Sequence, residues 1–159
     1  MSDAPPQLVS VEPGYRNVLR VRIAAGTAVL LVPSLVLGGA LIDQGLLAAI
    51  PALTIAILGI AAVVAIPHRR YLRLRYRLSE RVLQVVRGWL FHTDTVVPLV
   101  RVQHIDVVRG PLEKMFGTAT LVVHTAGTHN SIVTLPGLSP EKAAEIRDAI
   151  RQHVRTDFA

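Results

Sequence analysis

The sequence predicts an α+β protein in which a two-helix transmembrane hairpin precedes an antiparallel β-barrel or sandwich capped by a C-terminal α-helix. Two long uncharged runs fill much of the first half of the chain. Short segments of alternating apolar and polar residues follow, and the last segment has helical periodicity. We therefore divide the chain into a flexible cytoplasmic tail (1–20), a hairpin (21–67) and a β-rich domain (68–159).

The two apolar runs extend from Ile23 to Ile42 and from Gly45 to Ile66. A helix needs about 20 apolar residues to cross the hydrocarbon core, so we predict two spans, over about 23–42 and 45–66. Only Asp43 and Gln44 separate them, so the spans must be antiparallel neighbours. A signal peptide is disfavoured because a second span follows at once. A buried hairpin is disfavoured because the remaining chain is too short to cover two helices that are apolar on all sides.

Basic residues flank the hairpin on both outer sides, and the short turn between the runs has none. They are Arg16, Arg20 and Arg22 before the first run and Arg69, Arg70, Arg73, Arg75 and Arg77 after the second. The positive-inside rule therefore predicts an integral membrane protein with both termini in the cytoplasm. This placement explains the formal charge of +6 more economically than nucleic-acid binding does.

Six short strands and one helix are predicted after the hairpin. The strands cover residues 71–78, 82–87, 93–97, 102–108, 119–125 and 131–135. In the first, apolar residues alternate with Arg73, Arg75 and Arg77, which gives one basic face. Ser139 and Pro140 have the residue types of a helix N-cap and first position, and the helix should run to about His153. Its apolar stripe is Ala143, Ile146, Ile150 and Val154.

One string of residues, with the order of these elements, is similar to a known family. The string runs from Val97 to Val107 (VPLVRVQHIDV) and from Arg109 to Glu113 (RGPLE), and continues through Phe116-Gly117, Thr120-Leu121 and His124 to Gly127. It resembles the bacterial pleckstrin-homology (PH) domain family of the YdbS-like membrane type, whose members have paired N-terminal spans. The resemblance covers roughly Tyr15 to Val154. It implies a PH-like fold of two roughly orthogonal sheets with a capping C-terminal helix, and it implies a fold more than a function.

The phosphoinositide-binding motif of eukaryotic PH domains does not carry over. That motif needs basic residues on both sides of a long loop between the first two strands, whereas here only Ser79 and Glu80 separate them. The tryptophan common in the eukaryotic C-terminal helix is also missing. Phosphoinositide recognition is therefore not expected from the resemblance.

Two segments are candidates for contact with lipid or a partner. The arginines Arg69, Arg70, Arg73, Arg75 and Arg77 could meet anionic headgroups, at roughly 1 kcal/mol per residue near the surface. They could equally be a topology signal that continues into a solvated strand face. The segment from Gly110 to Gly117 is either a turn whose Leu112, Met115 and Phe116 pack on the barrel, or a docking loop. In the docking interpretation the contact residues are Leu112, Lys114 and Phe116.

The histidines and acids form no recognisable reactive group. His104 and Asp106 share one face of a strand, where they could act as a base with its orienter or as two metal ligands, but surface residues often show this spacing. His68, His92, His124 and His129 are scattered without metal-site spacing, and the chain has no cysteine. We therefore expect no catalytic residue, no metal and no cofactor, and we do not expect an enzyme.

These observations favour a non-enzymatic, membrane-anchored PH-like module for protein interaction or assembly at the cytoplasmic membrane face. Its partners would be the lipid bilayer and other membrane or PH-like proteins or further copies of itself, and not nucleic acid. An anionic-lipid-sensing domain is the alternative, because of the arginine-rich strand. An oligomeric pore or transporter subunit is disfavoured, since the spans hold no ionisable residue and ion pathways usually need them.

Overall fold

A computed structural model describes residues 8–40, 49–89, 91–126 and 132–156 of the protein. The chain divides into two compact units, which are treated separately below. One unit is Arg16–Arg69, and the other combines Met1–Tyr15 with Arg70–Ala159. The division is discontinuous, because the chain leaves the second unit after Tyr15 and returns to it at Arg70.

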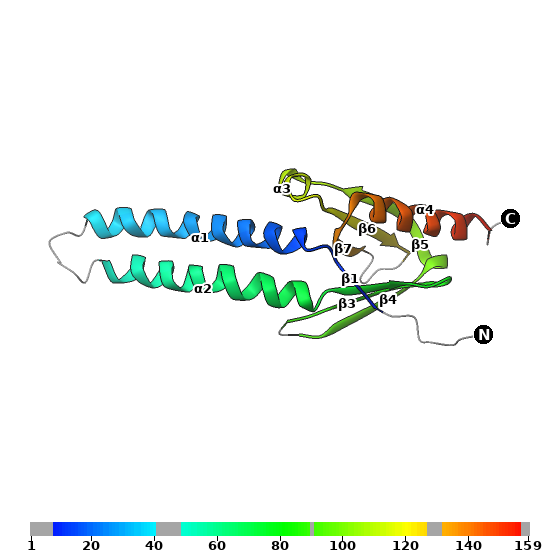
Figure 1. The fold of residues 1–159 in the computed structure, drawn as a ribbon, viewed down its shortest axis with the longest axis horizontal. Coiled ribbons are helices and arrows are strands. Elements are labelled where there is room, and N and C mark those ends of the chain that lie inside the picture. The colour runs from blue at the N-terminus through cyan, green and yellow to red at the C-terminus, as the bar shows by residue number, and fades with distance from the viewer. Residues whose placement is uncertain (1–7, 41–48, 90, 127–131, 157–159) are drawn as a thin grey trace. The chain divides into compact units, whose positions relative to one another are not determined.

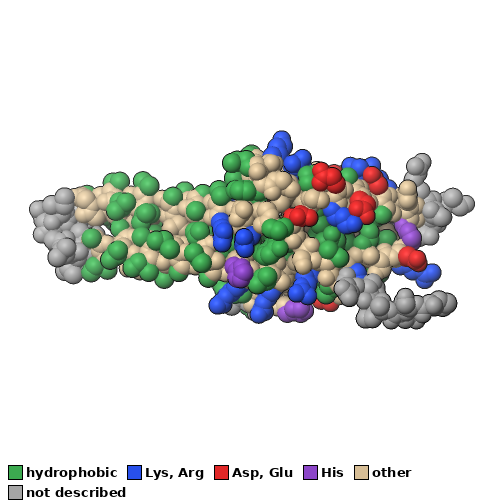
Figure 2. Space-filling model, in the orientation of Figure 1, with side chains coloured by type: hydrophobic (Ala, Val, Ile, Leu, Met, Phe, Trp, Pro, Cys, Tyr) green, Lys and Arg blue, Asp and Glu red, His purple; other side chains and the backbone are tan. Residues whose placement is uncertain are grey.

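The first unit is a pair of helices that run side by side, α1 (Gly14–Ala40) and α2 (Ile50–Leu72) (Figure 1). Both are long and apolar enough to cross a membrane, and hydrophobic side chains lie along both on the face that Figure 2 shows. Gly59 lies against Thr27, so close that a Cβ on Gly59 would come 2.1 Å from the Thr27 methyl carbon. A small residue is therefore required where the two helices touch, as is usual between membrane helices.

The second unit contains two antiparallel sheets. The first sheet has the order β1-β2-β3-β4 and the second has the order β5-β6-β7. The first comprises β1 (Val9–Ser10), β2 (Arg75–Leu78), β3 (Val82–Arg87) and β4 (Thr93–Pro98), and the second β5 (Val102–Val108), β6 (Ala119–Thr125) and β7 (Ile132–Leu138). The described strands make no ladder from one sheet to the other, so the sheets form an open sandwich rather than a closed barrel.

Helices complete the domain. The 3-10 turn η2 (Leu99–Arg101) joins the sheets, α3 (Pro111–Met115) joins β5 to β6, and α4 (Pro140–Thr156) follows β7. Helix α4 contacts β5, β6 and η2. The predicted α+β fold class is thus confirmed, with two apolar helices followed by antiparallel sheets and a C-terminal helix.

The core of this unit is formed by the inward residues of both sheets and by one face of α4. Of the predicted apolar stripe, Ala143, Ile146 and Ile150 are fully buried, and the side chain of Val154 lies outside the described part. The side chains at the core's centre are Leu83, Val85, Leu121, Val123, Leu135, Leu138, Ile146 and Ile150. Burial of this stripe is the main reason that α4 docks, because isolated helices of this length are marginal in water.

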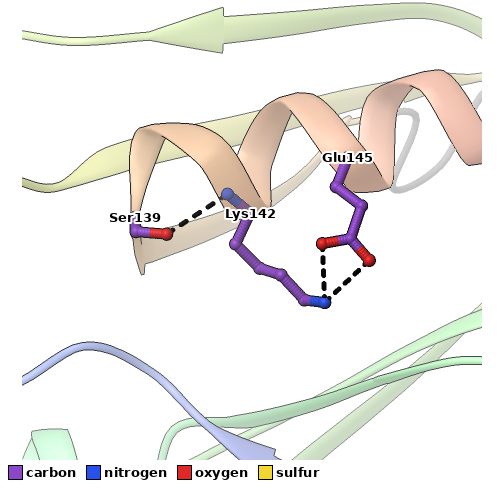
Figure 3. A network of polar contacts seen from close by, with 3 residues as sticks. All are labelled: Ser139, Lys142 and Glu145. Carbon is purple, nitrogen blue, oxygen red and sulfur yellow. Dashed lines mark hydrogen bonds and ion pairs between the residues drawn. The ribbon is translucent and has the colours of Figure 1, made fainter.

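The start of α4 is capped as its sequence predicts. The Ser139 hydroxyl accepts a hydrogen bond from the Lys142 backbone amide at 3.2 Å (Figure 3). The Lys142 ammonium donates to both oxygens of Glu145 at 2.9 Å, one turn further along the helix. The cap satisfies an amide that would otherwise lack a partner, typically worth about 1 kcal/mol.

The expectation of a flexible tail is wrong for residues 8–20. Strand β1 pairs with β2, with Val9 opposite Tyr76 and Ser10 opposite Arg75. Val11 is buried in the core, and the Glu12 amide donates to the Gly137 carbonyl at 2.7 Å. Helix α1 then begins at Gly14, well before the predicted span. Residues 1–7 of the predicted tail lie outside the described residues.

The first predicted strand is also shorter than expected. Helix α2 continues through Leu72, and β2 begins only at Arg75. Alternation of apolar and polar residues cannot separate the two structures here, because the last helical residues satisfy the same short pattern. The strands predicted at 82–87, 102–108 and 119–125 are confirmed with the same bounds, and those at 93–97 and 131–135 are confirmed with small extensions. Ser131 and the turn at Asp43-Gln44 lie outside the described residues.

If β1 and its neighbours belong to the domain, Val11→Ala should lower the free energy of unfolding by about 1.5 kcal/mol, from the loss of two buried carbon atoms. Leu8→Ala, at a partly exposed site of the same segment, should change it by less than about 0.5 kcal/mol. Denaturant unfolding of the full-length protein in detergent micelles, followed by the fluorescence of Trp89, measures both. If both substitutions changed the free energy of unfolding equally and negligibly, the segment would not be part of the domain, and the prediction of a flexible tail would stand.

Tyr76 is buried in β2, and its ionisation should lower the stability of the domain at high pH. Burial raises the pKa of Tyr76; Lys142 opposes this, whereas Glu12 and Glu145 reinforce it. Because the folded-state pKa lies above the unfolded-state value of about 10, the stabilisation is intact below about pH 10 and is lost as the pH rises through the folded-state pKa. Above pH 10, the free energy of unfolding of the wild type should fall more steeply than that of Tyr76→Phe. Parallel curves for the two proteins would contradict this expectation.

Candidate functional site

The five candidate arginines do not form one basic strand face. Arg69 and Arg70 are exposed on the last turn of α2, and Arg73 is exposed in the turn that follows. Only Arg75 and Arg77 lie on β2, where Arg75 is exposed and Arg77 is half-buried with a polar interaction. The prediction of one basic strand face is wrong because α2 continues to Leu72. Arg69 and Arg70 therefore follow helical spacing instead of strand alternation.

Arg75 and Arg77 lie on the outer face of the first sheet, among neighbours of mixed polarity. The register places Arg75 opposite Val86, and Arg77 opposite Gln84. The Gln84 amide donates to both carboxylate oxygens of Asp94, at 2.9 and 2.7 Å. The acid on this face is therefore already hydrogen-bonded within the sheet. The densest positive charge lies at Arg69, Arg70 and Arg73, where the chain leaves the apolar helix.

The segment around α3 is held in place by a buried carboxylate. Glu113 is only 8% exposed; it accepts a hydrogen bond from the Gly110 amide at 2.5 Å and from the Thr120 hydroxyl at 3.4 Å. The Thr118 amide also donates to the Glu113 carbonyl at 2.8 Å. These bonds fix the short helix against the start of β6. Sequence reasoning did not single out Glu113, although Glu at the third helical position is the acidic half of a capping box.

The side chains presented by α3 differ from expectation. Met115, which was predicted to pack on the barrel, is 75% exposed, and Lys114 is exposed beside it. Leu112 and Phe116 are half-buried. Methionine points outward because Glu113 takes the inward position of this single helical turn. The outward pair therefore combines an apolar and a basic side chain.

A polar cluster lies on the outer face of the second sheet. His104 Nε2 is 2.8 Å from Asp106 Oδ1, and His124 Nε2 is 3.5 Å from Asp106 Oδ2. The two rings lie 5.8 Å apart, on neighbouring strands. All three side chains are substantially solvent-exposed. Sequence spacing placed His104 beside Asp106 but missed His124, which only the pairing of β5 with β6 brings to them.

This cluster has limited chemistry. Both imidazoles contact one carboxylate at an exposed surface, where such contacts contribute little to stability. No group of three or more histidines or acids that could hold a metal occurs among residues 8–40, 49–89, 91–126 and 132–156. The geometry is that of a surface ion pair shared by two histidines.

The outer edge of the first sheet borders a groove. Strand β4 ends the sheet, with β3 as its neighbour among the described strands. A groove of about 380 Å³ runs along its whole length, and its far side is formed by residues of the second sheet and of η2. On the far side these are Arg101, Thr125, Ala126 and Val133. Sequence reasoning missed the groove because strand order is a long-range property.

Comparison with protein families matches residues 23–154 to the family described as bacterial PH domain. Among curated proteins, the transmembrane protein YdbS of Bacillus subtilis (strain 168) is 38% identical over 96 residues. That alignment covers 60% of this chain and 58% of YdbS, so it spans a little more than half of that relative. No solved structure matches the chain.

Proposed function

The chain belongs to the bacterial PH domain family, and from that premise we propose that it is an interaction module that receives an extended segment of a partner protein at the cytoplasmic face of the membrane. The chain belongs to a PH domain family, is similar to a transmembrane protein and has two helices able to cross a bilayer. It is a membrane-associated module. The cytoplasmic orientation rests on the arginines that flank the hairpin.

The observation that supports a protein partner is the groove along β4. A strand at the edge of a sheet presents backbone amides and carbonyls that have no partner within the sheet, and another chain can pair with them. The groove here follows β4 from Thr93 to Pro98, a length suited to an added strand. Val96, 54% exposed, offers an apolar contact, and Arg101 offers a positive charge across the groove. The occupant we propose is an extended peptide segment with at least one acidic residue.

A photo-crosslinking amino acid placed at Val96 of the full-length protein should capture one recurrent membrane protein in cells. The same group placed at Val100, which is 62% exposed and does not line the groove, should not capture it. Val96→Lys should abolish co-purification of that partner, because its charged stem would occupy the groove. Equal capture from both positions, or a partner retained by Val96→Lys, would exclude docking at β4.

A second candidate function is contact with anionic lipid, as in a lipid-sensing domain. It is favoured by the exposed positions of Arg69, Arg70 and Arg73 directly after the apolar part of α2. Juxtamembrane arginines attract anionic headgroups, and salt screens that attraction. This candidate needs no groove, so it is independent of the protein partner.

The double variant Arg69→Glu, Arg73→Glu should bind anionic lipid more weakly. At about 1 kcal/mol per residue, the loss is about 2 kcal/mol, or roughly 30-fold in affinity. Competition between phosphatidylglycerol and phosphatidylcholine for full-length protein in nanodiscs measures it, at low and at high salt. Arg101→Glu is the control, since Arg101 belongs to η2 and lies outside the juxtamembrane arginines. Unchanged competition in the double variant would reject this candidate.

A further inference from the structure

A second cavity lies at the end of the domain to which the spans are covalently joined. It has a volume of about 350 Å³, and every residue that lines it belongs to the β-rich unit. Tyr15, the last residue before the chain leaves this unit, lines it, and so does Arg70, the first residue after the chain returns. We call this end of the domain the anchor end. The two residues at which the chain leaves and re-enters this unit therefore both line the cavity.

Arg87 is the central cation of the cavity. Along β3, Leu83 and Val85 point into the core, and Arg87 continues on the same side at the strand's end. Its Nε atom is buried and has no hydrogen-bond partner among the described residues. A buried donor of a charged group that has no hydrogen-bond partner destabilises the fold unless a ligand pairs with it. In a cavity, such a donor is available to form a hydrogen bond with an oxygen atom of a ligand.

The turn after β3 brings aromatic side chains to the same cavity. Gly88 has φ +149°, and a Cβ there would come 2.1 Å from the Phe91 carbonyl oxygen, so only glycine fits. This turn places Trp89 and Phe91 on the cavity lining, where Phe91 is 84% exposed. Tryptophan prefers the headgroup level of a bilayer, where one side of the ring is apolar and the other is wet.

The chemistry of the lining is selective for an anion. Among the described residues that line it, Arg70 and Arg87 are charged and none is acidic. Thr93 adds a hydroxyl. Guanidinium groups bind phosphate through paired N–H donors, and a cavity of this size accepts a small phosphate ester.

We infer that this cavity binds the phosphate group of a phosphate ester, with Arg87 and Arg70 as its donors and Trp89 beside it. The phosphate could be supplied by a glycerophospholipid headgroup or by a soluble phosphate ester. The inference goes beyond both proposed functions, because it depends on Arg87, which neither lines the β4 groove nor belongs to the juxtamembrane arginines. The cavity shares Thr93 with the groove and Arg70 with the juxtamembrane arginines. It does not require either function to be correct.

The fluorescence of Trp89, the chain's single tryptophan, reports occupancy directly. Full-length protein in detergent micelles is titrated with dihexanoyl-phosphatidylglycerol, with glycerol phosphate, and with dihexanoylglycerol as the phosphate-free control. We expect saturable changes with one or both phosphate compounds and none with dihexanoylglycerol. Saturation by the phospholipid alone assigns the site to lipid, and saturation by glycerol phosphate shows that a soluble ester is sufficient.

Arg87→Gln should weaken the saturable binding by at least about tenfold, whereas Arg81→Gln, at an exposed arginine outside the cavity and outside the juxtamembrane arginines, should leave it unchanged. Arg87→Lys keeps the charge but loses the Nε donor, so it should bind with intermediate strength. Its thermal unfolding checks that the fold is intact. No saturable change with either phosphate compound, an equal change with dihexanoylglycerol, or wild-type affinity in a folded Arg87 variant would overturn the inference. A failure of the nanodisc competition would leave this result untouched, so the two outcomes are distinguishable.

Discussion

The pairing of β1 with β2 is the constraint on which the rest of the structure depends. Val9 and Ser10 precede the hairpin, and their partners Tyr76 and Arg75 follow it. The bond from the Glu12 amide to the Gly137 carbonyl adds a second tie between the same two parts of the chain. The β-rich domain is therefore assembled from both sides of the hairpin, and the two spans are an insertion within it. A hairpin inserted in this way that crosses the bilayer must return to the side from which it left.

This arrangement also explains why particular residues gather at the anchor end. Gly14 is pressed against the Phe116 carbonyl, and Tyr15 against Gly137, whose φ of +82° bends β7 at that point. A side chain at either glycine would collide with backbone or ring atoms. Tyr15 also lines the cavity, together with Arg87 at the end of β3 and Trp89 in the turn after it. The chain that leads into the insertion therefore forms part of the cavity wall.

Sequence reasoning found the elements whose signal is local. Clear alternation of apolar and polar residues marks the strands 102–108 and 119–125, and a capping residue marks the helix start at Ser139. The family resemblance predicted how these elements combine into a fold. It missed β1, because a strand of two residues has no period, and its partner is separated from it by the whole hairpin. It missed the inward position of Arg87, because the adjacent Val85 and Val86 made the inner face of that strand ambiguous. The groove beside β4 and the meeting of His124 with Asp106 depend on strand order, which no local pattern contains.

The insertion of the hairpin within the domain has a consequence for how the protein is made. Residues 8–15 are translated before the two spans, and their partner strand β2 is translated after them. The segment therefore stays without its partner strand until β2 has been made. Completion of the domain therefore reports that the hairpin has been inserted with both ends on the same side. A nascent chain whose second span fails to integrate cannot bring β1 to β2, so faulty membrane insertion becomes a folding defect that proteolytic quality control can recognise.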